Sequence, residues 1–523
     1  MAGIHVIFKV FFLCCFLFLN PIKQLVAQNY QYSVNFNQVK DDRVEVSLIP
    51  PKQKIKEVIF SFPKIIPGTY SISDYGKFIS NLAAYDDKGK MLQVIRLNDN
   101  QWKIKKAKRL HTIKYTVDDI FDADIPHEIY PMAATNIEEG KNIVINAPGF
   151  FGYLAHQRNI PVQITIDKPN NFYGSSSNSP QSQGAHTDLF KLKNIDELYD
   201  TPIMYGIADT ASLKIGNCEV LVSVYSPNKQ VHAQEIIVWL ADLLKASKSY
   251  LGGKLPADRY AFLYYFKDPA IKQSFRPGLA GALEHTTSSF YYLPELPADQ
   301  LKKFVVDVSS HEFFHIITPL TIASKEVKEF NYDDVALSKH LWLYEGTTEY
   351  TAHHVQVKYG LNTKQQFLDK LAKKIIDSQK NYNDTLSFTE LSKYAASTYA
   401  DQYGNVYQKG ALIAACLDIY LLHLSDGGYG LKNLTHDLGV RFGKDHYFDD
   451  DLLFDEIEKL SYPEIKQFLI KYVQGTEPIP YDYYFGLAGI QYNAGNTGVL
   501  IPNEHADAHA RHIQKIWLTS AIK

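Results

Sequence analysis

The sequence is poor in cysteine, methionine and tryptophan, with only four residues of each among 523. Cys14 and Cys15 lie in an apolar run close to the N-terminus, so a processed chain would keep only Cys218 and Cys416. This count excludes a fold stabilised by a disulfide framework, and two buried thiols are expected rather than one bridge. A chain of this length can build its core from size alone.

A strong excess of either charge is also missing. The 54 Lys and Arg residues almost balance the 57 Asp and Glu residues, leaving a net charge of -3. Nothing in this balance favours nucleic acid or an anionic membrane as a partner. Hydrophobic residues make up 46% and charged residues 21%, which is typical of a globular protein, and the length predicts two or three domains.

Long hydrophobic runs are absent apart from one at the N-terminus. Val10–Leu19 follows the positive charge of Lys9, and it is too short to cross a membrane comfortably. Leu13 stands where a lipoprotein signal needs a small residue before its cysteine. We therefore expect residues 1–28 to be a cleaved signal peptide, and the mature protein to be secreted or periplasmic and free of the membrane.

The hydrophobic pattern changes once along the chain. Short runs of period two, among them 44–48 and 58–62, predict an antiparallel β-sandwich at 29–228, with a polar loop at 173–186. A helical period begins at 232–251, and helices are expected to dominate 229–475. Residues 476–523 are expected to form a short C-terminal tail. The predicted fold class is multidomain α+β.

The clearest chemical motif lies in the apolar segment 301–319, which is expected to be helical up to about Thr318. His311 and His315 are four residues apart, so their imidazoles stand on one face of a helix and can share a Zn²⁺ ion. Glu312 lies beside the first histidine, where its carboxylate can take a proton from a metal-bound water. A buried helix with incidental histidines would place two polar rings on an apolar face without partners, which is costly.

A third metal ligand is expected on a neighbouring helix at 341–359. Glu345 lies in its first turns, and an antiparallel pair of helices could bring its carboxylate to the metal. Spacing alone leaves other candidates open: Glu349, His340, His353 and His354. A solvated face or a satisfied core histidine is the simpler interpretation of each of those four.

Two further segments resemble a known group of enzymes. Trp342-Leu343-Tyr344-Glu345-Gly346 is similar to the WxxEG motif of the gluzincin aminopeptidases, and Gly281-Ala282-Leu283-Glu284-His285 is similar to their exopeptidase strand. The long separation between His315 and Glu345 resembles the glycyl aminopeptidase family. That resemblance implies a thermolysin-like zinc peptidase domain behind an N-terminal β-sandwich.

Three more stretches agree with the same family. They are Ile66 to Tyr75, which resembles PGSYLIRDY, Asp196 to Pro202, which resembles DELxDSP, and Tyr407 to Leu412, which resembles YxKGxL. Ser73 departs from the usual arginine, a change expected to concern the sandwich rather than catalysis. Members typically end in a PDZ domain of about ninety residues. The chain ends soon after Gly489, so no complete PDZ domain is expected.

The resemblance also implies roles for individual residues. Zn²⁺ would be held by His311, His315 and Glu345, Glu312 would act as general base, and Tyr407 would steady the oxyanion. Glu284 would hold the free α-amine of a peptide substrate, while Gly281 and Ala282 would let the substrate backbone approach. The expected activity is removal of small N-terminal residues, glycine and alanine first. A gluzincin endopeptidase or broad peptidase, or a non-catalytic secreted binding protein, remains the alternative.

The leader gives the first testable prediction. Because Val10–Leu19 predicts export with cleavage, the exported protein should begin near Asn29 and should be soluble in the periplasm or the medium. Mass spectrometry of the exported protein measures this directly. An intact Met1 on that protein would contradict cleavage and favour a retained signal anchor.

Overall fold

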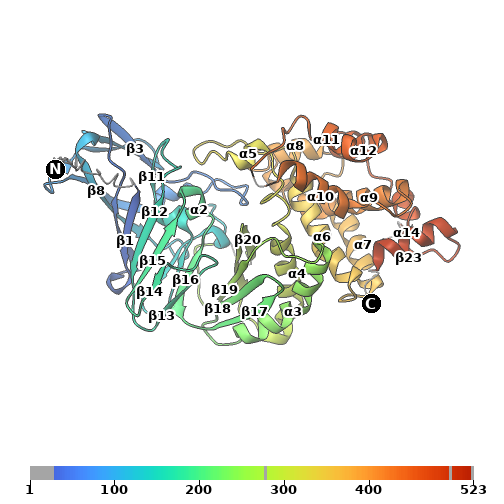
Figure 1. The fold of residues 1–523 in the computed structure, drawn as a ribbon, viewed down its shortest axis with the longest axis horizontal. Helices are drawn as coiled ribbons and strands as arrows, with labels where there is room; N and C mark the ends of the chain where they lie inside the picture. Colours follow the sequence, from blue (N-terminus) through green and yellow to red (C-terminus); the bar gives the residue numbers. More distant parts are fainter. Residues whose placement is uncertain (1–28, 276–278, 444, 494–497, 520–523) are drawn as a thin grey trace, which may run out of the picture.

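The computed structural model describes residues 29–275, 279–443, 445–493 and 498–519. The predicted signal peptide, residues 1–28, lies outside the described residues. Sheets built from the first part of the chain lie at one end of the molecule, and helices from its second half lie at the other (Figure 1). The fold class predicted from the sequence is confirmed: mostly antiparallel sheets precede a mostly helical domain in a multidomain α+β arrangement.

Three sheets make up the N-terminal part, and all their pairs are antiparallel except β1 with β12. The largest has the order β14 (Ser182–Gln183), β15 (Thr187–Leu192), β12 (Val162–Asp167), β1 (Tyr30–Asn35), β2 (Arg43–Ile49), β8 (Leu110–Asp118), β4 (Ile79–Asp86) and β5 (Met91–Leu92). The others are β13 (Phe172–Ser175), β16 (Ile203–Ile207), β10 (Asn142–Ile145) and β9 (Asn136–Glu138), and β11 (Tyr153–Leu154), β3 (Glu57–Ser61), β7 (Gln101–Lys105) and β6 (Val94–Arg96).

The period-two pattern explains these strands. In β2 the side chains of Val44, Val46 and Leu48 are buried while their neighbours are exposed or half-buried. The predicted loop at 173–186 is partly wrong, because β13 begins before it and β14 lies inside it. A Cβ atom on Gly174 would lie 2.6 Å from the Tyr205 ring, so the small residue serves packing rather than a loop.

A five-stranded mixed sheet joins the two ends of the molecule (Figure 1). Its order is β17 (Thr210–Ile215), β18 (Cys218–Tyr225), β19 (Arg259–Lys267), β21 (Ser288–Pro294) and β20 (Gly281–His285). Leu263 and Tyr265 face the core of the N-terminal sheets, whereas Phe262 and Tyr264 face the helices α3 (Ala233–Tyr250) and α4 (Ala298–Phe314). The N-terminal half therefore packs against one face of this sheet, and the helical half packs against the other face.

This sheet includes strands from both sides of residue 228, where the sequence predicts a domain boundary. Strands β17 and β18 precede residue 228, yet β18 pairs in parallel with β19 and both belong to the sheet that carries β20. The change of period near residue 229 marks the first long helix of this part of the chain. It does not mark the start of the five-stranded sheet, whose first strand along the chain is β17.

The helical part packs around α9 (Asn405–Leu424), which is buried over most of its length. The other helices are α6 (Thr347–Lys358), α7 (Lys364–Asn381), α8 (Phe388–Lys393), α10 (Leu431–Phe442), α11 (Leu453–Leu460) and α12 (Pro463–Leu469), with the short α1 (Ala147–Phe150), α2 (Ile195–Tyr199) and α5 (Lys325–Lys328) elsewhere. Cys218 and Cys416 are free and buried, as predicted. Among the described residues, no helix is long and apolar enough to cross a membrane.

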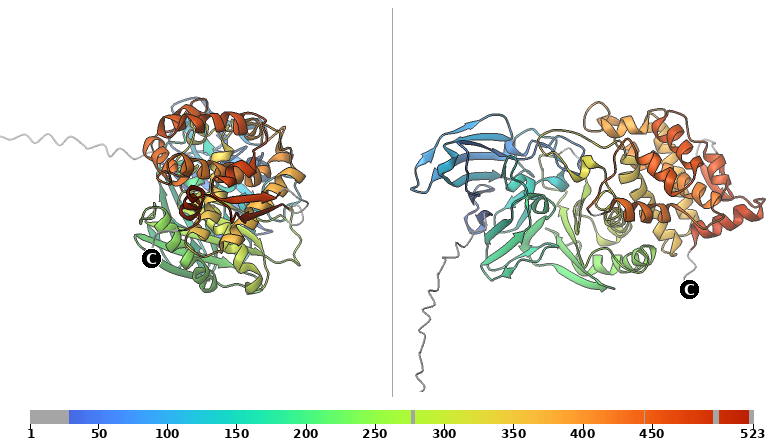
Figure 2. Two further views of the ribbon diagram at one scale, coloured as in Figure 1. Left: turned by 90° about the vertical axis from the view of Figure 1, so that its right-hand side faces the viewer. Right: turned by 45° about the horizontal axis from the view of Figure 1, so that its top comes forward.

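The C-terminal segment is more ordered than the short tail expected from the sequence. It forms α13 (Tyr481–Gly486), a hairpin of β22 (Ile490–Asn493) and β23 (Val499–Pro502), and α14 (Ala508–Leu518), at the helical end in both views of Figure 2. The indole of Trp517 is fully buried and donates a hydrogen bond of 2.7 Å to the Tyr350 hydroxyl. The carbonyl oxygen of Trp517 lies 2.7 Å from Nε2 of His354. The segment therefore docks on α6.

Trp517→Ala should destabilise the folded protein by about 3–5 kcal/mol, because it opens a cavity and leaves the Tyr350 hydroxyl without its donor. Chemical denaturation followed by fluorescence or circular dichroism measures the change. Lys515→Ala, on the exposed side of the same helix, should unfold like the wild type. If both variants unfold at the wild-type midpoint, α14 does not contribute to the core.

Candidate active site

The predicted histidine pair lies at the C-terminal end of α4. The helix ends at Phe314 rather than near Thr318, so His315 is its C-terminal cap. Nδ1 of His315 lies 3.0 Å from the Thr318 carbonyl oxygen. Because that oxygen only accepts, Nδ1 carries the proton, which orients Nε2 toward the interior of the site.

Helix α6 runs antiparallel to α4 and carries the third candidate ligand at its start. The Ser310 hydroxyl donates to the Ala352 carbonyl oxygen (2.9 Å), and the Gln356 amide donates to Asp307 (3.1 Å). Higher residue numbers on one helix thus meet lower numbers on the other. The turn before α6, Trp342–Gly346, is π-helical, a geometry that occurs often at functional sites. It places Glu345 opposite His315.

Two glycines let α9 approach this turn closely. A Cβ atom on Gly346 would lie 2.5 Å from the Gly410 carbonyl carbon, and one on Gly410 would lie 2.9 Å from Cα of Gly346. This contact brings the first turns of α9 to the histidines, and the Tyr407 ring centre lies 5.6 Å from that of His311. The WxxEG and YxKGxL motifs therefore meet at their glycines.

Three lone-pair atoms converge between these elements. Nε2 of His311 and Nε2 of His315 are 3.1 Å apart, and Oε2 of Glu345 lies 3.4 and 3.6 Å from them. Tetrahedral ligands at zinc distances are about 3.3 Å apart. Nδ1 of His311 lies 2.8 Å from the Glu349 carboxylate, so this ring also carries its proton away from the cluster. The donor set fits a divalent cation.

The charges around the cluster also favour a cation. Burial would suppress the ionisation of Glu345, but His315, His311 and a hydrogen bond with Tyr70 outweigh it and lower the pKa of Glu345. Burial raises the pKa of Glu312 well above its usual value, and the nearby Glu284 charge adds to this effect. Oε2 of Glu312 is buried without a hydrogen-bond partner in the structure. A bound cation would relieve this accumulation of negative charge.

Glu349 supports the first histidine instead of joining the cluster. Burial opposes its ionisation, yet Lys374 and His353 lower the pKa of Glu349 well below its usual value, so it is a carboxylate. Lys374 donates to Oε1 of Glu349 (2.6 Å) and to the Tyr407 carbonyl oxygen (2.9 Å). This carboxylate–histidine contact is typical of metal sites. The sequence did signal this residue, because Glu349 follows Glu345 by one helical turn. In the sequence analysis, however, Glu349 was a candidate only for a metal ligand.

The remaining candidate histidines lie elsewhere. Nε2 of His340 contacts the Asp450 carbonyl oxygen at 2.8 Å, and Nε2 of His353 contacts Glu349 at 3.0 Å. His354 lies against Trp517, and burial lowers its pKa to about 4. Structural contacts therefore explain all three.

Strand β20 is the edge strand of the five-stranded sheet and runs beside the cluster. The carboxylate of Glu284 lies within 4.8 Å of both the Glu312 carboxylate and the His315 ring. Burial raises the pKa of Glu284, as does the charge of Glu345. Gly281 lies against the N-terminal half, because a Cβ atom there would lie 2.2 Å from Cε at the end of the Met132 side chain. Ala282 is half-buried beside it.

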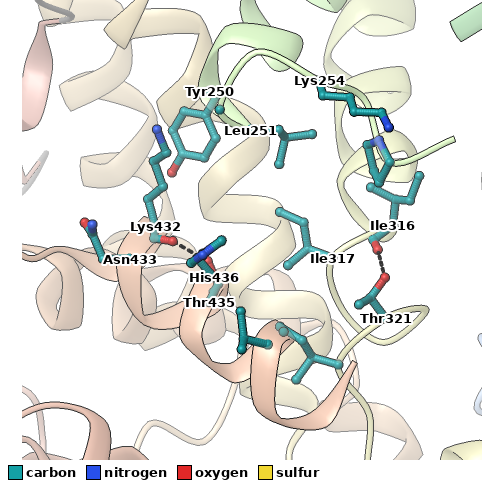
Figure 3. A pocket seen from close by; sticks show the side chains of 15 residues that line it. Tyr250, Leu251, Lys254, Ile316, Ile317, Thr321, Lys432, Asn433, Thr435 and His436 are labelled. Carbon is teal, nitrogen blue, oxygen red and sulfur yellow. Dashed lines mark hydrogen bonds between the residues drawn. The ribbon is translucent and has the colours of Figure 1, made fainter. Parts of the chain in front are cut away.

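A cleft of about 680 Å³ opens beside Glu284. Its walls come from both halves, including Pro67, Tyr199, Thr287, Leu320 and Tyr332. A second cavity, of about 520 Å³, lies behind the loop that follows His315 (Figure 3). Its walls include Tyr250, Ile316 and Ile317, the imidazole of His436 and the amines of Lys254 and Lys432, and contain no carboxylate. Of these two cavities, the cleft is the one that reaches the Glu284 carboxylate.

Solved structures of known proteins share this architecture. A crystal structure of an aminopeptidase N family protein from Idiomarina loihiensis aligns with a TM-score of 0.77 at 21% identity, over 89% of this chain and 79% of that chain. An M1 zinc metallopeptidase variant from Deinococcus radiodurans, bound to a Tyr-Ser-Ala substrate, aligns with a TM-score of 0.53 at 12% identity, over 87% of this chain and 95% of that chain. At these identities the likeness establishes the fold. No curated protein sequence matches significantly.

Two family models match the sequence itself. The Peptidase M61 N-terminal domain matches residues 31–207, and the M61 glycyl aminopeptidase matches residues 305–413. The second match spans the histidine pair, Glu345 and Tyr407, and the first ends just before β17. The chain therefore belongs to the M61 glycyl aminopeptidase family of zinc metallopeptidases.

Proposed function

We propose that this chain is an exported, zinc-dependent aminopeptidase that removes small N-terminal residues, glycine and alanine first, from peptides. Export rests on the leader at 1–28, and the preference for small residues rests on the family resemblance alone. The observation that carries the proposal is the place of Glu284. Its carboxylate lies within 4.8 Å of the proposed general base and of one metal ligand, on an edge strand.

An edge strand can pair with the backbone of an extended peptide. A peptide lying along β20 would bring its free α-amine to the half-buried Glu284 carboxylate while its first peptide bond reaches the cluster. A charge-assisted contact of this kind contributes roughly 1.5–3 kcal/mol. The short distance between Glu284 and Glu312 leaves room for about one residue between amine and scissile bond, which favours cleavage from the N-terminus.

The proton transfers fall to Glu312. His311, His315 and Glu345 would hold the zinc ion, which as a Lewis acid polarises a carbonyl group and makes water more acidic. Glu312 takes the proton of the attacking water and passes it to the leaving amine. Its unpartnered Oε2 atom is free to accept that proton.

Two groups complete the reaction site. Burial raises the pKa of Tyr407 well above its usual value, so its hydroxyl stays protonated and can donate a hydrogen bond to the developing oxyanion. Loss of one such donor typically costs about 3–4 kcal/mol in the transition state. Glu349 holds His311 in the tautomer that leaves Nε2 free.

One observation favours an endopeptidase as a second candidate. The cleft continues past Glu284 to His285, Thr286 and Thr287, and reaches Asp200 and Tyr332. An endopeptidase would use this space for residues on the N-terminal side of the scissile bond. A blocked N-terminus on a test peptide distinguishes the two activities, because only the aminopeptidase requires a free α-amine.

Glu284→Ala should lower kcat/KM for free-amine peptides roughly 10- to 100-fold, because the contact to the α-amine is lost. Acetylated peptides should be poor substrates of the wild type and should not respond to the change. Steady-state kinetics on matched free and acetylated peptides measures both. Glu139→Ala, at an exposed position, serves as a control for the loss of a carboxylate.

Equal ratios of free to acetylated cleavage in the wild type and Glu284→Ala would contradict the aminopeptidase proposal. The endopeptidase would then replace it. Glu312→Gln should abolish both activities under either proposal.

A further inference from the structure

The segment 66–70 of the N-terminal half reaches the active site. The sequence resemblance assigned it to the sandwich, but the structure places its glycine against the Glu284 carboxylate. A Cβ atom on Gly68 would lie 2.9 Å from both Oε1 and Oε2 of Glu284 and 2.7 Å from Cδ1 of Leu283. Only a residue without a side chain leaves the Glu284 carboxylate in its present position.

Two residues further on, Tyr70 lies against the other side of the site. Its ring centre is 5.4 Å from that of Tyr403, whose hydroxyl is hydrogen-bonded to the Tyr407 hydroxyl at 2.8 Å. The side chain of Tyr70 also lies beside the Glu345 carboxylate, within reach of a hydrogen bond from its hydroxyl. A phenol hydroxyl carries one proton, which it can donate to a carboxylate oxygen.

The backbone of this segment is held in an uncommon conformation. Gly68 has φ +80° and Tyr70 has φ +46°, a region that residues with a side chain seldom occupy. The Thr69 hydroxyl donates to the Ile66 carbonyl oxygen (3.2 Å) inside the turn. On either side, Lys64 accepts from the Ser73 amide at 2.8 Å and donates its own amide to the Tyr332 carbonyl oxygen at 2.8 Å. The surrounding structure therefore fixes the turn.

We propose that Gly68 and Tyr70 are positioning residues of the active site, contributed by the N-terminal sheets. Because Gly68 has no side chain, the Glu284 carboxylate can lie against its backbone, in position to contact the substrate amine. Tyr70 orients the Glu345 carboxylate toward the two histidines, as partners of metal-ligating carboxylates commonly do. The part concerning Gly68 rests on the proposed role of Glu284, whereas the part concerning Tyr70 requires only the metal cluster.

Gly68→Ala should lower kcat/KM for free-amine peptides about tenfold or more, mainly by raising KM, because the new methyl group displaces the Glu284 carboxylate. Cleavage of acetylated peptides and zinc content should stay unchanged. Gly89→Ala is the matched control: its φ of +75° gives the same backbone strain, and a Cβ atom there meets nothing within 4 Å. It should behave like the wild type toward both substrates.

Tyr70→Phe keeps the ring on Tyr403 and removes only the hydroxyl. It should lower kcat several-fold with little change in KM, and it should speed the loss of zinc to a chelator about tenfold. Tyr483→Phe, on an exposed ring, should leave zinc loss unchanged. The chelation measurement detects an effect on the metal site without relying on activity.

The outcomes separate this inference from the proposed function. If Glu284→Ala lowers the free-to-acetylated ratio but Gly68→Ala does not differ from Gly89→Ala, the role of Gly68 is wrong and the aminopeptidase proposal stands. If Tyr70→Phe loses zinc at the wild-type rate, the role of Tyr70 is wrong. If Glu284→Ala itself leaves the ratio of free-amine to acetylated cleavage unchanged, the proposed aminopeptidase function is wrong. The zinc-loss measurement on Tyr70→Phe then still decides whether Tyr70 positions Glu345.

Discussion

The active site depends on the convergence of two unprotonated imidazole nitrogens and one carboxylate at a buried position. His311 and His315 both direct their protons outward, to Glu349 and to the Thr318 carbonyl oxygen, so their other nitrogens face each other at 3.1 Å. Glu345 adds a negative charge between them. Two lone pairs directed at each other repel, and a divalent cation bound by all three groups would turn this repulsion into attraction.

The elements around this cluster serve to hold it in place. The antiparallel pair of α4 and α6 sets the distance between ligands, and the Gly346–Gly410 contact brings α9 and Tyr407 close. The five-stranded sheet presents β20 to the cleft, and its two faces are covered by different halves of the chain. The N-terminal half is thus part of the reactive region, through Gly68, Tyr70 and the residues that it contributes to the cleft wall.

Local chemistry was predictable from the sequence, whereas the long-range arrangement was not. The histidine pair depends only on the helical repeat, so four residues of spacing were enough to predict it. The choice of Glu345 over Glu349 depends on a π-helical turn and on the packing of two helices, neither of which the spacing encodes. The sequence did not reveal that one sheet includes strands from both sides of residue 228, because β17 and β18 look like any other strands. Only the pairing of β17 with β18 and of β18 with β19 assigns them to this sheet. For the same reason Gly68 was given no role of its own in the sequence analysis, because its contact with Glu284 joins positions far apart in the chain.

The central claim, that this cluster is a zinc site, is tested most directly by the zinc content of the purified mature protein. The account predicts about one zinc per chain for the wild type and for Glu284→Ala, and almost none for His315→Ala. A His315→Ala variant that keeps full zinc occupancy would contradict the assignment of the ligands, and with it the mechanism built on them.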